Sequence, residues 1–113
     1  MSQARPFACN MSALSAEQRA QHTHLAALLS KALVGVRELP NGYEFDFPFD
    51  ASTYQALVQI TPLEHACCPF FAIAIRLGED ERQRLLWQLT GSEGVKQFIR
   101  AEFSSWFQNG PAE

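Results

Sequence analysis

The feature that most restricts the possible folds is the segment YEFDFPF at residues 43–49, where aromatic residues occupy every second position. Successive side chains of a strand point to opposite faces of a sheet, so this alternation predicts a half-buried strand with its aromatic face inward. The sequence PNG at residues 40–42 is typical of a tight turn. Residues 34–39, before that turn, contain β-branched valines, which favour a strand. The three segments together predict an antiparallel hairpin.

A second hairpin is predicted further along the chain. Apolar residues alternate over residues 71–77 and again over residues 85–89, and the segment between them, 78–82, is polar. This pattern is typical of two strands joined by a short loop. With the first hairpin, these strands predict a four-stranded antiparallel sheet whose apolar face is covered by helices.

Three helices are predicted around the hairpins. Ser15 and Gln18 have the spacing of a capping box, and leucines at helical spacing follow them. Asp50 is a suitable N-cap for a second helix. The first helix is expected to end near residues 33–35, the second to run roughly to Cys67, and the last to lie between residues 91–93 and 109–111.

Two prolines bear on the second helix. Thr61-Pro62-Leu63-Glu64 has the pattern of an N-cap, an N1 proline and an N3 acid, so the helix is expected to kink or restart there. In that interpretation Glu64 is a capping acid. Pro69 disfavours the α conformation at Cys68 and is expected to end the helix.

These patterns predict a single α+β domain over residues 1–113, with the order α-ββ-α-ββ-α, an antiparallel four-stranded sheet and helices on one face. Residues 1–12 are expected to be irregular or to form a short edge strand. With 47% hydrophobic and 19% charged residues, the composition is that of a globular chain. A chain of this length can bury a core without disulfides.

Charge and hydropathy exclude several partners. The net charge is −3 and no basic run occurs, which argues against binding to nucleic acid or to a membrane surface. The apolar run at residues 66–75 is about half the length of a membrane span. We see no signal peptide, and three cysteines make a poor disulfide framework, so we expect a cytoplasmic protein with reduced thiols.

The adjacent Cys67 and Cys68 are the first candidates for chemistry. Soft ions such as Hg(II), Cu(I) and Zn(II) prefer thiolate ligands. Consecutive side chains on a helix diverge by about 100°, so the pair needs a further ligand, and Cys9 is the remaining thiol. The helix C-terminus and Glu64 are both expected to raise the thiol pKa values. The first hypothesis is therefore a heavy-metal-binding protein with Cys9, Cys67 and Cys68 as ligands.

Other polar residues are weaker metal-ligand candidates. Glu64 is expected to be a cap before it is a ligand. His65 lies three residues before Cys68, a spacing that can bring the two side chains together, although a solvated His65 is the simpler interpretation. His22 is expected at the rim of the core, hydrogen-bonded. Glu102 falls within the apolar arc of the last helix and is expected to extend toward solvent at its edge.

Two alternative functions remain open. A redox or small catalytic protein would use Cys67 or Cys68 as nucleophile beside Glu64 or His65. A Cys67–Cys68 disulfide would then hold its Cα atoms about 3.8 Å apart, which makes a strained and easily reduced bond. Alternatively, the cysteines only fill the core, and the protein is a structural or partner-binding module. Its partner could then be a second copy of the chain, in a homodimer. No Gly-rich phosphate loop is present, and we expect no nucleotide cofactor.

The chain resembles a family of short, largely uncharacterised bacterial proteins. The shared features are an early cysteine (Cys9), a central E-x-x-C-C-P-F motif at residues 64–70, and a closing segment, LTGSEGV, at residues 89–95. These proteins are associated with heavy-metal and especially mercury resistance. The resemblance implies that Cys9, Glu64, Cys67 and Cys68 form one motif set, whereas Pro62 departs from the family's simplest pattern.

Overall fold

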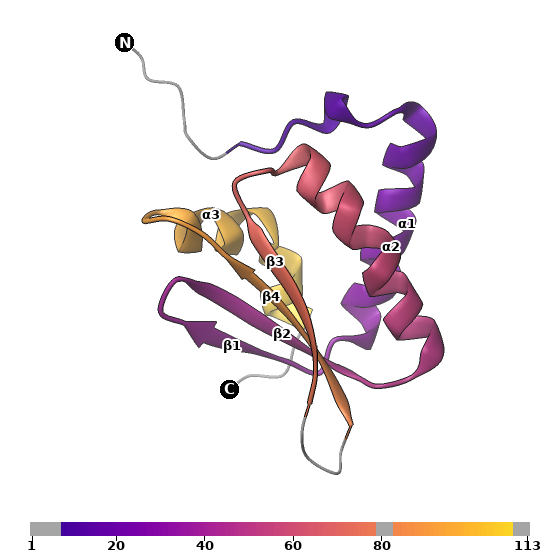
Figure 1. The fold of residues 1–113 in the computed structure, drawn as a ribbon, viewed down its shortest axis with the longest axis vertical. Coiled ribbons are helices and arrows are strands. Elements are labelled where there is room, and N and C mark those ends of the chain that lie inside the picture. The colour runs from indigo at the N-terminus through magenta and orange to yellow at the C-terminus, as the bar shows by residue number, and fades with distance from the viewer. Residues whose placement is uncertain (1–7, 79–82, 110–113) are drawn as a thin grey trace.

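The computed structural model describes residues 8–78 and 83–109. It confirms the predicted order α-ββ-α-ββ-α and the four-stranded antiparallel sheet (Figure 1). In chain order the elements are η1 (Met11–Ala13), α1 (Ala16–Ala32), β1 (Gly35–Leu39), β2 (Gly42–Pro48), α2 (Ala51–Cys67), β3 (Ala72–Leu77), β4 (Arg84–Thr90), α3 (Val95–Glu102) and α4 (Ser104–Asn109).

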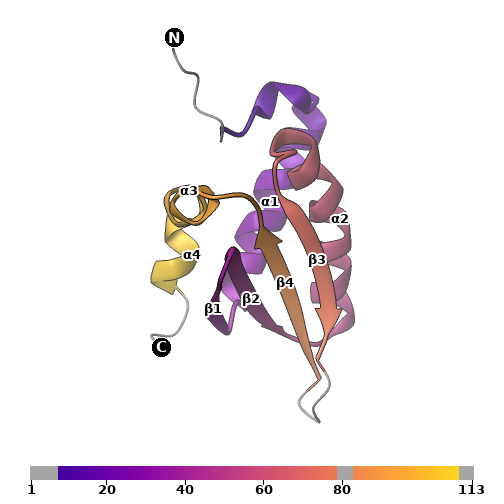
Figure 2. The same cartoon turned by 60° about the vertical axis from the view of Figure 1, so that its left-hand side comes forward.

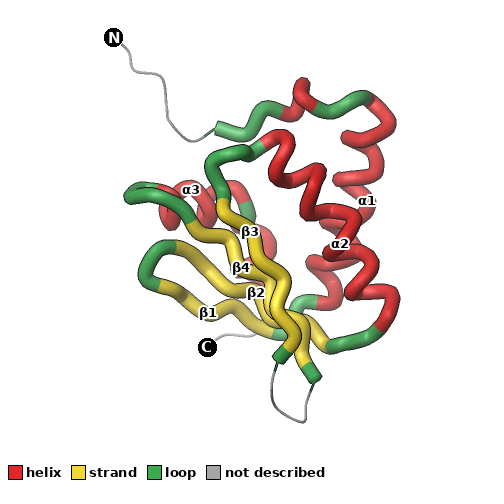
Figure 3. The backbone as a smooth tube through the Cα atoms, viewed as in Figure 1, coloured by secondary structure: helices red, strands yellow, loops and turns green. Residues whose placement is uncertain are grey.

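The two predicted hairpins join to form the sheet, with the strand order β1-β2-β4-β3 (Figure 3). The central strands pair Phe45 with Trp87, so the largest aromatic side chains of both strands share one face. Gly42 lies where the first hairpin meets β4, because a Cβ atom there would stand 2.0 Å from the Leu89 carbonyl oxygen. Only glycine allows these two strands to approach so closely.

The helices pack on the aromatic face of the sheet. Trp87 is fully buried, and its indole nitrogen donates a hydrogen bond to Thr61 Oγ1 of α2 at 3.0 Å. From the C-terminal helices, the Trp106 ring lies 5.9 Å from the Trp87 ring and 5.3 Å from the Phe45 ring. Figure 2 shows α1 and α2 side by side and α3 with α4 forming a second group. One core therefore connects the sheet to both helix groups.

The opposite face of the sheet carries charged residues. Glu44 is buried there, with only 4% of its surface exposed, and accepts hydrogen bonds from Arg37 Nε and Gln88 Nε2 at 2.9 and 2.8 Å. Arg84 donates to Asp46 Oδ2 at 2.9 Å on the same face. Strands β1, β2 and β4 are thus linked by side-chain bonds as well as by their backbone.

Helix α2 does not restart at Pro62, although a restart is one of the two outcomes predicted there. It runs without interruption from Ala51 to Cys67. Pro62 and Val58, one turn earlier, are both exposed, so the missing backbone hydrogen bond falls on the solvent side of the helix. Since no helix begins at Thr61, the prediction that Glu64 is a capping acid is wrong.

The C-terminal helical region also differs from the prediction. Its first helix begins at Val95 after Gly94, which adopts φ 95°, a left-handed conformation that favours glycine. The single predicted helix is divided at Phe103 into α3 and α4. Residues 110–111, at its predicted end, lie outside the described residues. Within the described ranges, every helix is too short or too polar to cross a membrane.

Candidate functional site

The end of α2 places Cys67 and Cys68 in the core. The capping hydrogen bond runs from the Cys68 N–H to the Glu64 carbonyl at 2.8 Å. Cys68 then leaves the helical conformation, with φ −131° and ψ 69°, as expected for a residue before proline. This turn lets both sulfurs lie on the buried side, 3.6 Å apart, although the cysteines are adjacent in the sequence.

The segment before α1 brings Cys9 to the same point. The Asn10 N–H donates to the Cys67 carbonyl at 2.7 Å, which fixes the N-terminal segment across the end of α2. Ser15 and Gln18 form the predicted capping box, which fixes the start of α1 after this segment. As a result the Cα atoms of Cys9 and Cys68 lie 4.6 Å apart, and the two residues form a disulfide.

This disulfide corrects the prediction that all three cysteines are reduced thiols. Cys9 and Cys68 are bonded across 59 positions of sequence, and Cys67 is the free cysteine. The alternative disulfide between the adjacent Cys67 and Cys68 is also absent, because Cys68 is bonded to Cys9. A trans peptide holds neighbouring Cα atoms at about 3.8 Å, below the usual disulfide range, whereas Cys9 approaches at a suitable separation.

Cys67 is a buried thiol between two acceptors. Its sulfur lies 3.6 Å from the Glu64 carbonyl oxygen and 3.6 Å from the Cys68 sulfur, which carries no hydrogen in the disulfide. Burial first, then the negative charges of Glu64 and Glu102, raise the Cys67 pKa from its usual 9.0 to about 11. This direction confirms the expected effect of Glu64, although burial is the larger cause, and it means that Cys67 is protonated at neutral pH.

Glu64 is the buried acid of the site. Its Oε1 atom lies 2.8 Å from His22 Nε2 of α1, and its Oε2 atom lies 3.4 Å from the Cys68 sulfur. Because a carboxylate oxygen can only accept, His22 Nε2 is the donor. His22 thus lies at the rim of the core with a hydrogen bond, as predicted, while Glu64 directs its second oxygen at the cysteines.

The other polar residues singled out in the sequence, His65 and Glu102, are exposed. For His65 this exposure agrees with the simpler interpretation of a solvated histidine. Glu102 is exposed, as expected, at the rim of a pocket of about 220 Å³. Cys9, His22, Glu64 and Cys67 also line this pocket, whereas Cys68 is excluded from its wall.

The structure therefore assembles four of the predicted site residues. One ligand atom from each of Cys9, Glu64, Cys67 and Cys68 lies within 4.8 Å of the others, and this group could hold a metal ion. His22 supports the group through Glu64 and is not one of its members. These four residues are also the motif set that the family resemblance implies.

Two features of the site were missed in the sequence. The Cys9–Cys68 pairing leaves no local signal, because it depends on how the N-terminal segment crosses α2. The burial of Glu64 did leave a signal. Leu57, Ile60 and Glu64 follow helical spacing on one face, so the acid continues an apolar stripe.

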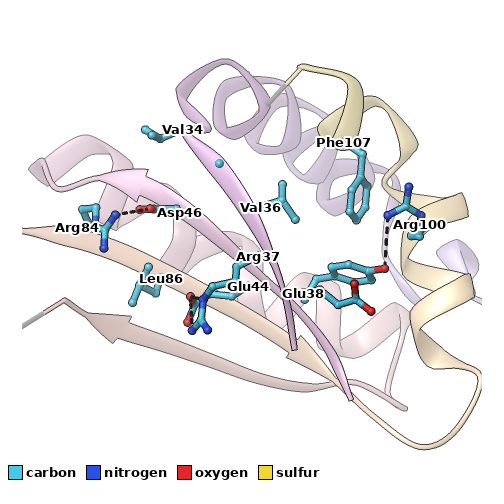
Figure 4. Close-up of a pocket in the computed structure, with 12 residues that line it drawn as sticks. Val34, Val36, Arg37, Glu38, Glu44, Asp46, Arg84, Leu86, Arg100 and Phe107 are labelled. Carbon is cyan, nitrogen blue, oxygen red and sulfur yellow. Dashed lines mark hydrogen bonds and ion pairs between the residues drawn. The ribbon is translucent and has the colours of Figure 1, made fainter. Parts of the chain in front are cut away.

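A larger hollow, of about 790 Å³, lies around strand β1 (Figure 4). Four of its charged side chains are paired with one another, Arg37 with Glu44 and Arg84 with Asp46, each at 2.9 Å. Glu38 pairs instead with Lys96, and Arg100 donates to Tyr43 Oη. The polar groups of this hollow therefore join the strands of the sheet to one another and to α3. The cysteine group is the stronger site because its donor atoms converge on one point.

Comparison with known proteins found no matching family model, curated protein or solved structure.

Proposed function

We propose that the reduced protein binds a soft metal ion, such as Hg(II), Cu(I) or Zn(II), through the thiolates of Cys9, Cys67 and Cys68, with Glu64 as a fourth ligand. The observation that carries the proposal is the convergence of these four side chains within 4.8 Å. Thiolates are the ligands that soft ions prefer, and three of them near one carboxylate are a suitable donor set. The disulfide form is then the oxidised state of the same site.

The spacing of the donor atoms suits a tetrahedral ion. With metal–sulfur bonds of about 2.3 Å, two sulfurs of a tetrahedral site lie about 3.8 Å apart. The Cys67 and Cys68 sulfurs are 3.6 Å apart, and the Cys68 sulfur is 3.4 Å from Glu64 Oε2. The separations between the Cys67 and Cys68 sulfurs and between the Cys68 sulfur and Glu64 Oε2 are therefore already close to those of a tetrahedral site. Binding also requires that the Cys9 and Cys68 sulfurs separate after reduction.

The surroundings of Glu64 favour a ligand role. An acid placed beside sulfur in a core is unfavourable unless its oxygens have partners. His22 satisfies Oε1 and leaves Oε2 facing the sulfurs, which is the arrangement of outer groups that orient metal ligands. The same contact fixes the rotamer of Glu64 before an ion arrives.

The ion must displace the proton of Cys67. Its raised pKa, about 11, makes this step unfavourable for ions that bind thiolate weakly. We therefore expect only strongly thiophilic ions to bind tightly. This selection agrees with the heavy-metal association that the resemblance implies, and mercury resistance is a proposal on the same basis.

Cadmium titration of the reduced protein tests the proposal, because cadmium–thiolate bonds absorb in the ultraviolet. The protein is reduced with a phosphine under nitrogen and titrated with Cd(II). Native mass spectrometry then gives the number of bound ions per chain. We expect one ion per chain, retained against excess glutathione. Cys9→Ser, Cys67→Ser and Cys68→Ser should each lower the absorbance and weaken retention.

His65→Ala provides the matched control, since His65 lies next to the cysteines in sequence but is exposed. This variant should bind cadmium as the unchanged protein does. Failure of the reduced protein to retain one ion, or retention that survives all three cysteine substitutions, would contradict the proposed function.

A further inference from the structure

The two sulfurs of the disulfide differ in their access to solvent. Cys68 is fully buried, with 0% of its surface exposed, whereas Cys9 is partly exposed. The pocket of about 220 Å³ is lined by Cys9 and not by Cys68. A molecule that enters this pocket therefore meets the Cys9 sulfur first.

The pocket wall is acidic around that sulfur. Glu64 and Glu102 both line the pocket, and His22 is the basic residue on the same wall. His22 already donates to Glu64, and Glu102 stands exposed at the rim. A positively charged group entering the pocket is thus attracted, and a negatively charged one is repelled.

We propose that Cys9 Sγ is the site at which a small external thiol opens the disulfide, with a preference for thiols that carry a positive charge. The thiolate of the external molecule attacks Cys9 Sγ, a new sulfur–sulfur bond forms, and the Cys9–Cys68 bond breaks. The bonding electron pair leaves with Cys68 Sγ, which takes up a proton. The product is a mixed disulfide on Cys9 and a buried thiol at Cys68.

A second molecule of the same thiol completes the reduction. It attacks the external sulfur of the mixed disulfide, releases the Cys9 thiol, and leaves as the oxidised dimer of the small thiol. Two thiols are oxidised and one protein disulfide is reduced, so electrons and protons balance. The internal alternative, attack of Cys67 on Cys68, is disfavoured because it joins neighbours whose Cα atoms lie about 3.8 Å apart.

This exchange goes beyond metal binding, because it concerns the oxidised protein and needs no ion. Its consequence for the proposed function is that a small thiol would convert the closed disulfide into the three-thiol state. A protein reduced by a phosphine reaches that state without the exchange. The two proposals can therefore fail separately.

Peptide mapping of the oxidised protein identifies the sulfur that is attacked. The full chain is treated with cysteamine, its free thiols are blocked with N-ethylmaleimide at about pH 6.5, and it is digested with trypsin at the same pH. Cys9 lies in peptide 1–19, since the bond between Arg5 and Pro6 resists trypsin, while Cys67 and Cys68 lie in peptide 38–76. We expect the cysteamine adduct on peptide 1–19. An adduct mainly on peptide 38–76 would overturn the assignment to Cys9.

Rate measurements test the charge preference. Opening by cysteamine is compared with opening by 3-mercaptopropionate, and both rates are divided by the rates for a neutral, exposed peptide disulfide. At low salt the normalised rate for cysteamine should be about three- to fivefold higher than the normalised rate for 3-mercaptopropionate. This ratio of rates should decrease as salt is added. Glu102→Gln, at an exposed position, should lower the ratio. A ratio of one, or a ratio unchanged in Glu102→Gln, would refute the preference.

Discussion

His22 Nε2 donates a hydrogen bond to Glu64 Oε1 at 2.8 Å and so joins helices α1 and α2 across 42 positions of sequence. The two side chains differ in exposure, with 18% of His22 and 4% of Glu64 accessible to solvent. The imidazole therefore lies between solvent and the buried acid. This contact also orients the carboxylate toward the cysteines, so it has both a structural and a functional consequence.

His22→Leu should destabilise the protein by about 1–3 kcal/mol, because it leaves a buried carboxylate oxygen without its donor. Urea unfolding of the oxidised protein at neutral pH measures the change. His65→Leu replaces an exposed histidine and should alter stability by less than about 0.5 kcal/mol. If both substitutions give the same small change, the contact between His22 and Glu64 contributes little to the fold.

The same substitution should also weaken metal binding if the proposed function is right. Outer groups that orient a ligand typically change metal affinity by about 10- to 100-fold. We expect His22→Leu to reduce the cadmium affinity of the reduced protein in this range, with the stoichiometry still one. His22→Gln retains a donor and should recover part of the loss. Equal affinities in all three proteins would contradict the orienting role.

Loss of the Cys9–Cys68 disulfide should reduce stability substantially. The bond closes a loop with a sequence separation of 59, for which chain entropy alone gives about 4 kcal/mol. Unfolding of the oxidised protein is compared with unfolding in the presence of a phosphine and a metal chelator. The oxidised protein should have the higher urea midpoint, and Cys9→Ser should resemble the reduced state.

Cys67→Ser is the control for this comparison, because Cys67 is outside the disulfide. Its oxidised form should still gain stability relative to its reduced form. If the unchanged protein has the same urea midpoint when oxidised and when reduced, the disulfide does not stabilise the fold by restricting the unfolded chain.

How much of this architecture could be predicted depends on the distance over which each signal acts. The aromatic alternation at residues 43–47 and the capping box at Ser15 and Gln18 are local, and both are found as predicted. Phe49, expected to continue the inward face, lies beyond the strand and is exposed. Pro62 gave a misleading local signal. The helix tolerates it because it lies on the exposed side, a fact that depends on how α2 packs.

In the candidate site, too, some features could be predicted from the sequence and others depend on contacts between distant segments. The sequence indicated Cys9, Glu64, Cys67 and Cys68 as one group, and the structure brings their ligand atoms together. It gave no indication that Cys9 pairs with Cys68, because that choice depends on the hydrogen bond between Asn10 and the Cys67 carbonyl. Contacts between distant segments decide which thiol remains free.

The Cys67 thiol should react slowly in the folded, oxidised protein. With its pKa raised to about 11, the thiolate fraction at neutral pH is small and increases about tenfold per pH unit. Iodoacetamide labelling followed by mass spectrometry should show slow modification at pH 7 and faster modification toward pH 10. Rapid labelling at pH 7 under native conditions would show that Cys67 is neither buried nor protonated.

The same shift predicts how stability depends on pH. The folded pKa, about 11, lies above the usual value of 9.0, so the unfolded chain loses its proton first. The contribution of Cys67 is therefore complete below about pH 9 and is lost as the pH rises toward 11. The difference in unfolding free energy between the unchanged protein and Cys67→Ala should decrease over this window. A difference independent of pH would contradict the shift.

The hydrogen bond between Trp87 and Thr61 gives a prediction for the scaffold that carries the site. Trp87 is fully buried, and Thr61 Oγ1 accepts from its indole nitrogen while donating to the Leu57 carbonyl at 2.7 Å. Thr61→Val preserves the shape but removes the acceptor, so the indole N–H remains buried without a partner. We expect a loss of about 1–3 kcal/mol in urea unfolding with the disulfide intact.

Thr61→Ser separates the hydroxyl from the methyl group. It keeps the acceptor for Trp87, and it should therefore retain most of the stability that Thr61→Val loses. If the two variants are equally destabilised, the methyl group rather than the hydrogen bond is responsible. If Thr61→Val is as stable as the unchanged protein, the indole finds another partner, and the link from β4 to α2 depends on packing of Trp87 alone.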